Sequence, residues 1–213
     1  MSKSVLISIA PKYCELVANG TKTIEIRKTE PKMDTPFKCY IYCTKPKKTV
    51  SCCGVTYFVD MLYVDHFSKM PTYGCTQFED VLNGKVIGEF VCNNIDYLTT
   101  PDLFEGMDEI SNSRIEEESC LSIDELLKYK GDKQEIYGWH ISKLVIYDKP
   151  RELREFRKSG ALSYDDWLYG MYNGKSESSY EKNLLPFVLT RPPQNWCYVE
   201  SIDVNNVQVL END

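Results

Sequence analysis

The stretch from Asn19 to Lys28 constrains the fold of this chain more than any other. It contains a glycine that ends a helix and, directly after it, a cluster of charged residues: Lys22, Glu25, Arg27 and Lys28. In an extended segment side chains alternate between two faces, so Ile24 and Ile26 share one face and Thr23, Glu25 and Arg27 share the other. Because burying a lone charge is expensive, the charged face must be internally paired or hold a ligand. The pattern therefore predicts a strand that forms one wall of a polar pocket.

Length and composition bound the kind of protein. At 213 residues and 42% apolar, the chain is long enough to bury a core as a single domain. We see no secretory leader and no apolar run long enough to cross a bilayer, so we expect a soluble, cytoplasmic protein that makes no membrane contact.

The nine cysteines are predicted to be reduced thiols, because their number is odd and no CxxC pair occurs. A zinc site would have to draw on the following residues: Cys39, Cys43, Cys52, Cys53, Cys75 and His66. Without the pair spacing of zinc-binding motifs, small core side chains are the better interpretation of these cysteines. We predict no metal and no cofactor.

Charge is distributed unevenly along the chain. The net charge is −7, but residues 1–50 carry a local +6 and the remaining residues −13. A basic N-terminal region on an otherwise acidic protein can steer a phosphate-bearing ligand to one side, although the charge counts alone favour a mixed, solvated surface.

The order of expected elements indicates an α+β fold. We expect strands over 5–9, 37–43, 85–92 (extending toward Tyr97), 136–147 and 196–199, besides the charged strand. Helices are expected from Pro11 to Gly20, over 123–129 behind a capping box of Ser122 and Glu125, and briefly after Pro150. Gly88 marks a bulge or a close backbone approach. Residues 44–83 and 158–183 lack regular periodicity.

These patterns predict a small mixed β-barrel with flanking helices and a C-terminal extension. The predicted organisation is a barrel over residues 1–150, a peripheral helical or loop lobe over 151–190, and a returning strand with a tail over 191–213. The lobe is also the candidate surface for a protein partner.

Three blocks of sequence resemble one family. Ser8–Pro11 with Asn19–Arg27, then Asn83–Phe90, and then Tyr137–Ile141 are similar to the ASCH domain (activating signal cointegrator homology), a β-barrel module similar to the PUA fold. The resemblance covers roughly residues 4–150 and the final strand. It implies a cavity beside the first helix, lined by the Gly-x-Lys-Thr strand, that holds RNA or a modified nucleoside.

The resemblance also implies alternatives that include catalysis. Members of the family include RNA-binding modules, a ribonuclease and small amidohydrolases that deacetylate N-acetylated cytidine. The amidohydrolases use a Lys, a Thr three residues later and a distant Glu. Lys22 matches the Lys, Glu25 stands in place of the Thr, and Glu118 lies in a stretch comparable to that of the distant Glu. A threonine nucleophile is therefore unsupported in this chain.

The candidate site residues follow from these two lines of argument. Glu25 is a candidate general base, with Lys22 and Arg27 holding a developing oxyanion or a phosphate. Glu118 is the third catalytic candidate. The candidate ligand-binding residues are Lys22, Thr23, Glu25, Arg27, Lys28, Tyr40 and Trp139. A nucleophile triad built on His66 or His140 lacks any nucleophile-elbow sequence, and the first glycine of a phosphate loop is missing upstream of Gly20.

Overall fold

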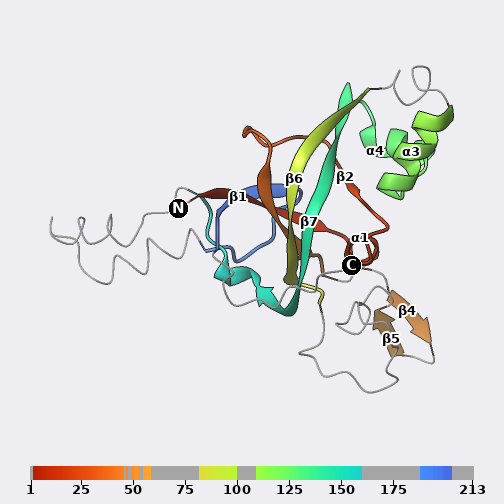
Figure 1. Ribbon diagram of the computed structural model, residues 1–213. Helices are drawn as coiled ribbons and strands as arrows, with labels where there is room; N and C mark the ends of the chain where they lie inside the picture. The colour runs from red at the N-terminus through yellow and green to blue at the C-terminus, as the bar shows by residue number, and fades with distance from the viewer. Residues whose placement is uncertain are drawn as a thin grey trace, which may run out of the picture.

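A computed structural model describes residues 2–45, 47, 49–52, 55–58, 82–99, 109–159 and 188–202 (Figure 1). Its first half contains β1 (Lys3–Ile9), α1 (Pro11–Ala18), β2 (Ile24–Arg27), β3 (Phe37–Cys43), β4 (Thr49–Cys52) and β5 (Val55–Phe58). Its second half contains β6 (Lys85–Thr99), α3 (Glu109–Ser119), α4 (Ile123–Lys130), β7 (Glu135–Glu152) and β8 (Trp196–Glu200). None of the described helices has the length and hydropathy to span a bilayer.

One mixed sheet organises the fold. Its six strands lie in the order β2-β7-β6-β3-β1-β8, with β1 and β3 parallel and the other neighbours antiparallel. The long strands β6 and β7 run side by side through the middle, and α3 and α4 lie together beside one end of them (Figure 1). Strands β4 and β5 pair separately as a two-stranded sheet.

The predicted closed barrel is not confirmed, because the sheet is open. Strands β2 and β8 occupy its two edges, and no backbone pairing joins them within the described residues. Side chains bridge the edges instead: Arg27 Nη1 donates to Asn195 Oδ1 at 3.2 Å, and Trp196 Nε1 donates to Thr29 Oγ1 at 3.0 Å. The two edges of a twisted sheet thus approach one another without completing a hydrogen-bonded ladder.

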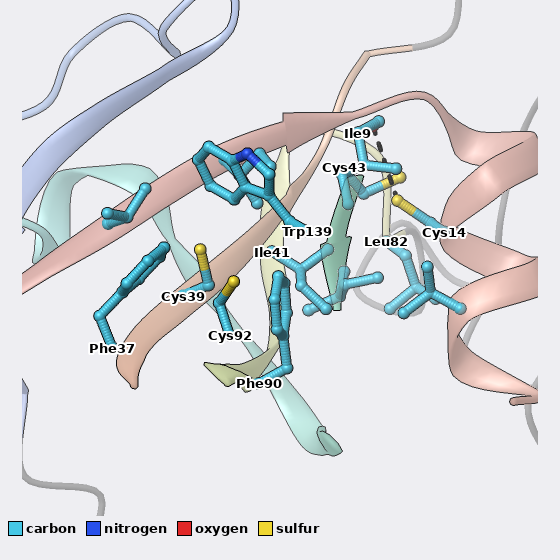
Figure 2. Packing of buried hydrophobic residues seen from close by; sticks show 14 residues of the cluster. Ile9, Cys14, Phe37, Cys39, Ile41, Cys43, Leu82, Phe90, Cys92 and Trp139 are labelled. Carbon is cyan, nitrogen blue, oxygen red and sulfur yellow. Dashed lines mark hydrogen bonds between the residues drawn. The ribbon is translucent and has the colours of Figure 1, made fainter. Parts of the chain in front are cut away.

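The two faces of the sheet bury different cores. On one face, α1 covers alternate residues of β1 and β3, with Phe37, Phe90 and Trp139 among the buried side chains (Figure 2). Tyr40, Tyr147 and Phe156 pack on the opposite face. Period-two alternation explains this division, because Cys39 and Ile41 join the first core while Tyr40 and Tyr42 join the second. A third cluster lies between β2 and the helices α3 and α4.

Several expected elements are confirmed. Helix α1 begins at Pro11, and Gly20 follows its end with a φ of +78°. The capping box of Ser122 and Glu125 begins α4. Gly88 lies at a register shift of β6, and a Cβ there would collide with the carbonyl oxygen of Val145, so the close backbone approach is real.

Other expectations need correction. Pro150 does not start a helix, because β7 continues through it to Glu152, and only one 3-10 turn (Leu153–Glu155) follows. Helix α3 was not predicted, and part of the stretch expected to be irregular forms β4 and β5. The greater part of the 151–190 lobe and the tail after Ile202 lie outside the described residues.

Candidate functional site

Lys22 lies almost completely buried at the turn between α1 and β2, with 2% of its surface exposed. Its backbone amide donates to the Leu16 carbonyl oxygen at 2.8 Å, which fixes the turn after Gly20. Its ammonium donates to the carbonyl oxygen of Ser119, the last residue of α3, and lies 3.5 Å from Glu25 Oε2. A lysine this deeply buried needs such partners, because transferring its charge from water is costly.

Glu25 and Arg27 continue the cluster along β2. Arg27 Nη2 lies 2.9 Å from Glu25 Oε1 and donates to the Ser8 carbonyl oxygen at 2.7 Å. Asn195 accepts from Arg27 and donates to Thr29 Oγ1 at 3.0 Å, so its amide is held at both ends. The predicted charged face of this strand is therefore confirmed as inward and internally paired. The cluster sets two basic side chains against one carboxylic one, a formal excess of one positive charge.

Buried polar atoms without hydrogen bonds gather in this cluster. Within the described part of the chain, Glu25 Oε2, Arg27 Nε and Trp139 Nε1 are all buried and make no hydrogen bond. Glu25 and Trp139 are direct partners in the β2–β7 ladder, so these atoms belong to neighbouring residues. Most buried polar groups in proteins are satisfied, and a concentration of unsatisfied ones indicates a place for water or a polar ligand.

Two tyrosines from different helices border the cluster. Tyr13 of α1 has its ring centroid 5.2 Å from Lys22 Nζ. Burial, together with the carboxylates of Glu125 and Glu25, raises the pKa of Tyr13. Burial also raises the pKa of Tyr129 in α4, against the opposing effect of the positive charge of Arg27. Both hydroxyls therefore remain protonated at neutral pH and can donate or accept hydrogen bonds.

Exposed lysines lie on the rings of these tyrosines. Lys12 Nζ is 5.3 Å from the Tyr13 ring centroid, and Lys28 Nζ is 5.1 Å from that of Tyr129. At the start of α4, the backbone amide of Ser122 lowers the pKa of the exposed Glu125 carboxyl, with smaller effects from Lys12 and Lys128. Exposed cations thus lie beside the two aromatic rings that border the site.

The remaining predicted site residues do not join this cluster. Tyr40 lies on the opposite face of the sheet, where its hydroxyl accepts from the Ile202 amide at 2.8 Å. The Glu118 carboxylate pairs with Arg114 at 3.0 Å, and only its backbone carbonyl contacts the site strand, at the Thr23 amide. The Thr23 side chain is exposed at the start of the strand.

Trp139 offers no open ring face for stacking. It is fully buried, packs edge-on against Phe37 with centroids 5.7 Å apart, and lies 6.0 Å from Trp196 (Figure 2). Its contribution to the site is limited to the indole N–H beside Glu25. Lys28 is exposed and reaches the site only through Tyr129.

The cysteines of the described chain are all unpaired thiols: Cys14, Cys39, Cys43, Cys92, Cys120 and Cys197. Burial raises the pKa of Cys14 and Cys39, which keeps these thiols neutral and poor metal ligands. No group of potential ligands in the residues placed by the structure could hold a metal ion. Cys53, Cys75 and His66 lie outside the described residues, as does the side chain of Cys52.

Sequence reasoning missed Tyr13 and three further contributors to the site. Ser119 acts through a backbone carbonyl, which leaves no residue-type signal. Asn195 reaches Arg27 across 168 positions of sequence, from the residue before β8. Tyr129 has the clearest sequence signal of the three, because an aromatic residue between Lys128 and Lys130 near a helix end is a natural surface contact.

A sequence model described as the ASCH domain matches residues 7–188. No curated protein matches the sequence. Crystal structures of an ASCH protein from Zymomonas mobilis are similar at 16% identity. One variant covers 93% of this chain and 91% of its own with a TM-score of 0.49. For a second variant the match covers 92% of this chain and 88% of the variant, with a TM-score of 0.48. For the unsubstituted protein it covers 87% of this chain and 96% of that protein, with a TM-score of 0.40.

Proposed function

The chain belongs to the ASCH domain family, and we propose that it binds RNA, or a free or modified nucleoside, at the Lys22–Glu25–Arg27 cluster. ASCH domains are generally RNA-associated. The observation that carries the proposal is the concentration of charged and unsatisfied polar groups on the inward face of β2. An anionic, hydrogen-bonding ligand complements both properties.

The charge balance favours a phosphate-bearing ligand. The cluster holds an excess positive charge in surroundings that exclude most water, where electrostatic interactions are stronger than in bulk solvent. Arg27 presents a planar fork suited to phosphate and to base edges, but two of its nitrogens already hold Ser8, Asn195 and Glu25. Its Nε–H and the free lone pairs of Glu25 Oε2 remain for the ligand.

A second candidate activity is hydrolysis of the exocyclic amide of an acylated cytidine. The observation that favours it is Glu25 Oε2, which makes no hydrogen bond and is adjacent to the Lys22 ammonium. In this reaction Glu25 takes a proton from water as the water oxygen attacks the amide carbonyl, and Lys22 stabilises the oxyanion. The C–N bond then breaks as the protonated Glu25 carboxyl returns the proton to the exocyclic nitrogen, which releases cytidine and the carboxylic acid. Glu118 is not required, because its carboxylate pairs with Arg114. Ribonuclease activity, with Lys22 or Arg27 stabilising the phosphorane, would use the same groups.

Binding is tested with the lysine at the centre of the cluster. We would titrate a fluorescein-labelled random dodecamer RNA, and separately unlabelled nucleosides, into the wild-type protein and into Lys22→Met. Loss of a charge-assisted hydrogen bond is expected to weaken affinity by about 10- to 100-fold.

Lys38→Met is the matched control. Lys38 also pairs with a glutamate, Glu89, at 2.7 Å, but on the opposite face of the sheet. Its affinity should stay within about twofold of the wild type, because phosphate attraction to one distant surface charge is screened by salt. Equal affinities for the wild type and Lys22→Met, with both proteins folded, would contradict the proposal. Product formation from N-acetylcytidine by the wild type, lost in Glu25→Gln, would select the second candidate.

A further inference from the structure

We propose that Tyr13 and Tyr129 are the stacking residues for an unpaired RNA base whose edge faces Glu25. This inference rests on the proposed function and specifies the part of the nucleotide that the site recognises. It adds two residues that neither the charged strand nor the family resemblance assigns to the site.

Both tyrosines lie next to side chains of the charged cluster, although neither belongs to β2. Tyr13 places its ring next to the Lys22 ammonium, and its hydroxyl is close enough to the carboxylates of Glu125 and Glu25 for their charges to disfavour its ionisation. The Tyr129 hydroxyl is close enough to Arg27 and Glu25 for both of their charges to act on its ionisation. The two side chains come from α1 and α4, so aromatic rings on two different helices border the same three buried side chains.

The exposure of the Tyr129 ring is unusual for this chain. Tyr129 is 36% exposed, and the only other large apolar side chain that exposed within the described residues is Tyr97, at 56%. Tyr13 is partly buried against the first core. Proteins that bind single-stranded nucleic acid combine aromatic rings, on which bases stack, with basic side chains and with polar groups that contact the base edges.

A bound base can replace the lysine ammonium groups that lie on these rings. Lys12 and Lys28 are exposed and place their ammonium groups about 5 Å from the ring centroids of Tyr13 and Tyr129. An exposed cation–π contact is weaker than the stacking of a base on the same ring. A base can therefore displace each ammonium from its ring, and each freed lysine can then reach a flanking phosphate. Ring and cation would thus bind different parts of one nucleotide.

A set of short oligonucleotides separates base stacking from phosphate attraction. We would use four trinucleotides, each with a different base between two abasic residues. An all-abasic trinucleotide of the same charge serves as the reference. Binding would be measured by isothermal titration to the wild type, to Leu and Phe variants of Tyr13 and of Tyr129, and to Tyr97→Leu. Tyr97→Leu is the matched control, because it removes an exposed tyrosine on β6 whose hydroxyl bonds Glu30 outside the site.

The proposal predicts that at least one base-containing trinucleotide binds the wild type about 5- to 150-fold more tightly than the all-abasic one. Tyr13→Leu and Tyr129→Leu should each remove much of this difference, whereas the Phe variants and Tyr97→Leu should retain it. Upfield ring-current shifts of the base protons should accompany binding and be reduced in the Leu variants. Circular dichroism would confirm that each variant is folded. If Tyr13→Leu is unfolded, the Phe variant and Tyr129→Leu carry the test.

Two kinds of failure are distinguishable. Equal binding of the base-containing and all-abasic trinucleotides by the wild type would overturn the stacking proposal while leaving RNA binding at the charged cluster intact. The same conclusion would follow if the folded Leu variants retained the full preference for a base. If the wild type bound none of the trinucleotides, both the proposed function and the stacking proposal would be overturned.

Discussion

Replacing Glu25 with glutamine should reduce the stability of the protein more than replacing either of its cationic partners. Glu25 is the only carboxylate within ion-pair distance of both Lys22 and Arg27 in the described structure, at 3.5 and 2.9 Å. Less than a tenth of each of these side chains is exposed, so the partners cannot turn out into water. Glu25→Gln therefore leaves two buried basic side chains without the carboxylate that pairs with both.

The magnitude follows from this geometry. Removing one partner of a buried ion pair typically costs about 3–5 kcal/mol, because an uncompensated charge stays buried. Lys22→Met should cost less, about 1.5–3 kcal/mol, since it removes one charge-assisted hydrogen bond while Glu25 keeps Arg27. Against a total stability of roughly 5–15 kcal/mol, both variants should remain mostly folded.

Urea unfolding, followed by the fluorescence of the buried Trp139 and by circular dichroism, gives the free energy of unfolding for each variant. Glu89→Gln is the matched control, because Glu89 forms an ion pair with one lysine, Lys38, whose side chain is one-third exposed, and the glutamine carbonyl oxygen can still accept the hydrogen bond from the Tyr147 hydroxyl. Its cost should be about 1 kcal/mol or less. A loss for Glu25→Gln no greater than that for Glu89→Gln or Lys22→Met would refute the reasoning that one carboxylate neutralises two buried cations.

Three further outcomes follow from other parts of the fold. Burial and the Glu89 carboxylate raise the pKa of Tyr147 above its ordinary 10.0, so stability should fall as pH rises past about 10, where only the unfolded chain loses that proton. Urea titrations at several pH values should show this decline, and a shallower one in Tyr147→Phe; identical slopes would contradict it. Gly88→Ala should lose roughly 1–3 kcal/mol in the same assay, because its Cβ meets the Val145 carbonyl, and an unchanged midpoint would contradict this. Ser122→Ala should accelerate amide exchange at the start of α4 by roughly 2- to 30-fold through loss of the capping box, whereas exchange equal to the wild type would show that the cap is dispensable.

Local patterns predicted the parts of the fold that depend on near neighbours in sequence. Strand alternation placed Glu25 and Arg27 on one face, and the Pro11 and Ser122 signals located two helix starts. These features depend on backbone geometry within a few residues. The helix predicted after Pro150 was wrong, because proline is tolerated near the end of a strand as well as in the first turn of a helix. Only the pairing of β7 with β6 decides between the two.

The composition of the site was less predictable, because its partners are distant in sequence or act through the backbone. Ser119 binds Lys22 with a carbonyl oxygen that every residue type possesses, and Asn195 reaches Arg27 only because β8 returns beside β1. Tyr40 was placed in the site by residue type, yet the pleat of β3 directs it to the other face. The open sheet likewise depends on the distance between β2 and β8, which no local pattern encodes.

Photo-crosslinking tests the central claim, that RNA binds at the inward face of β2 between α1 and α4, most directly. Short RNAs carrying 4-thiouridine would be irradiated with the wild-type protein, and the crosslinked peptides identified by mass spectrometry. We expect crosslinks in Pro11–Lys28 and Ser122–Lys130, and their loss in Lys22→Met but not in Lys38→Met. Crosslinks confined to β3 and β8, or to residues 161–187, and insensitive to Lys22→Met, would contradict the account.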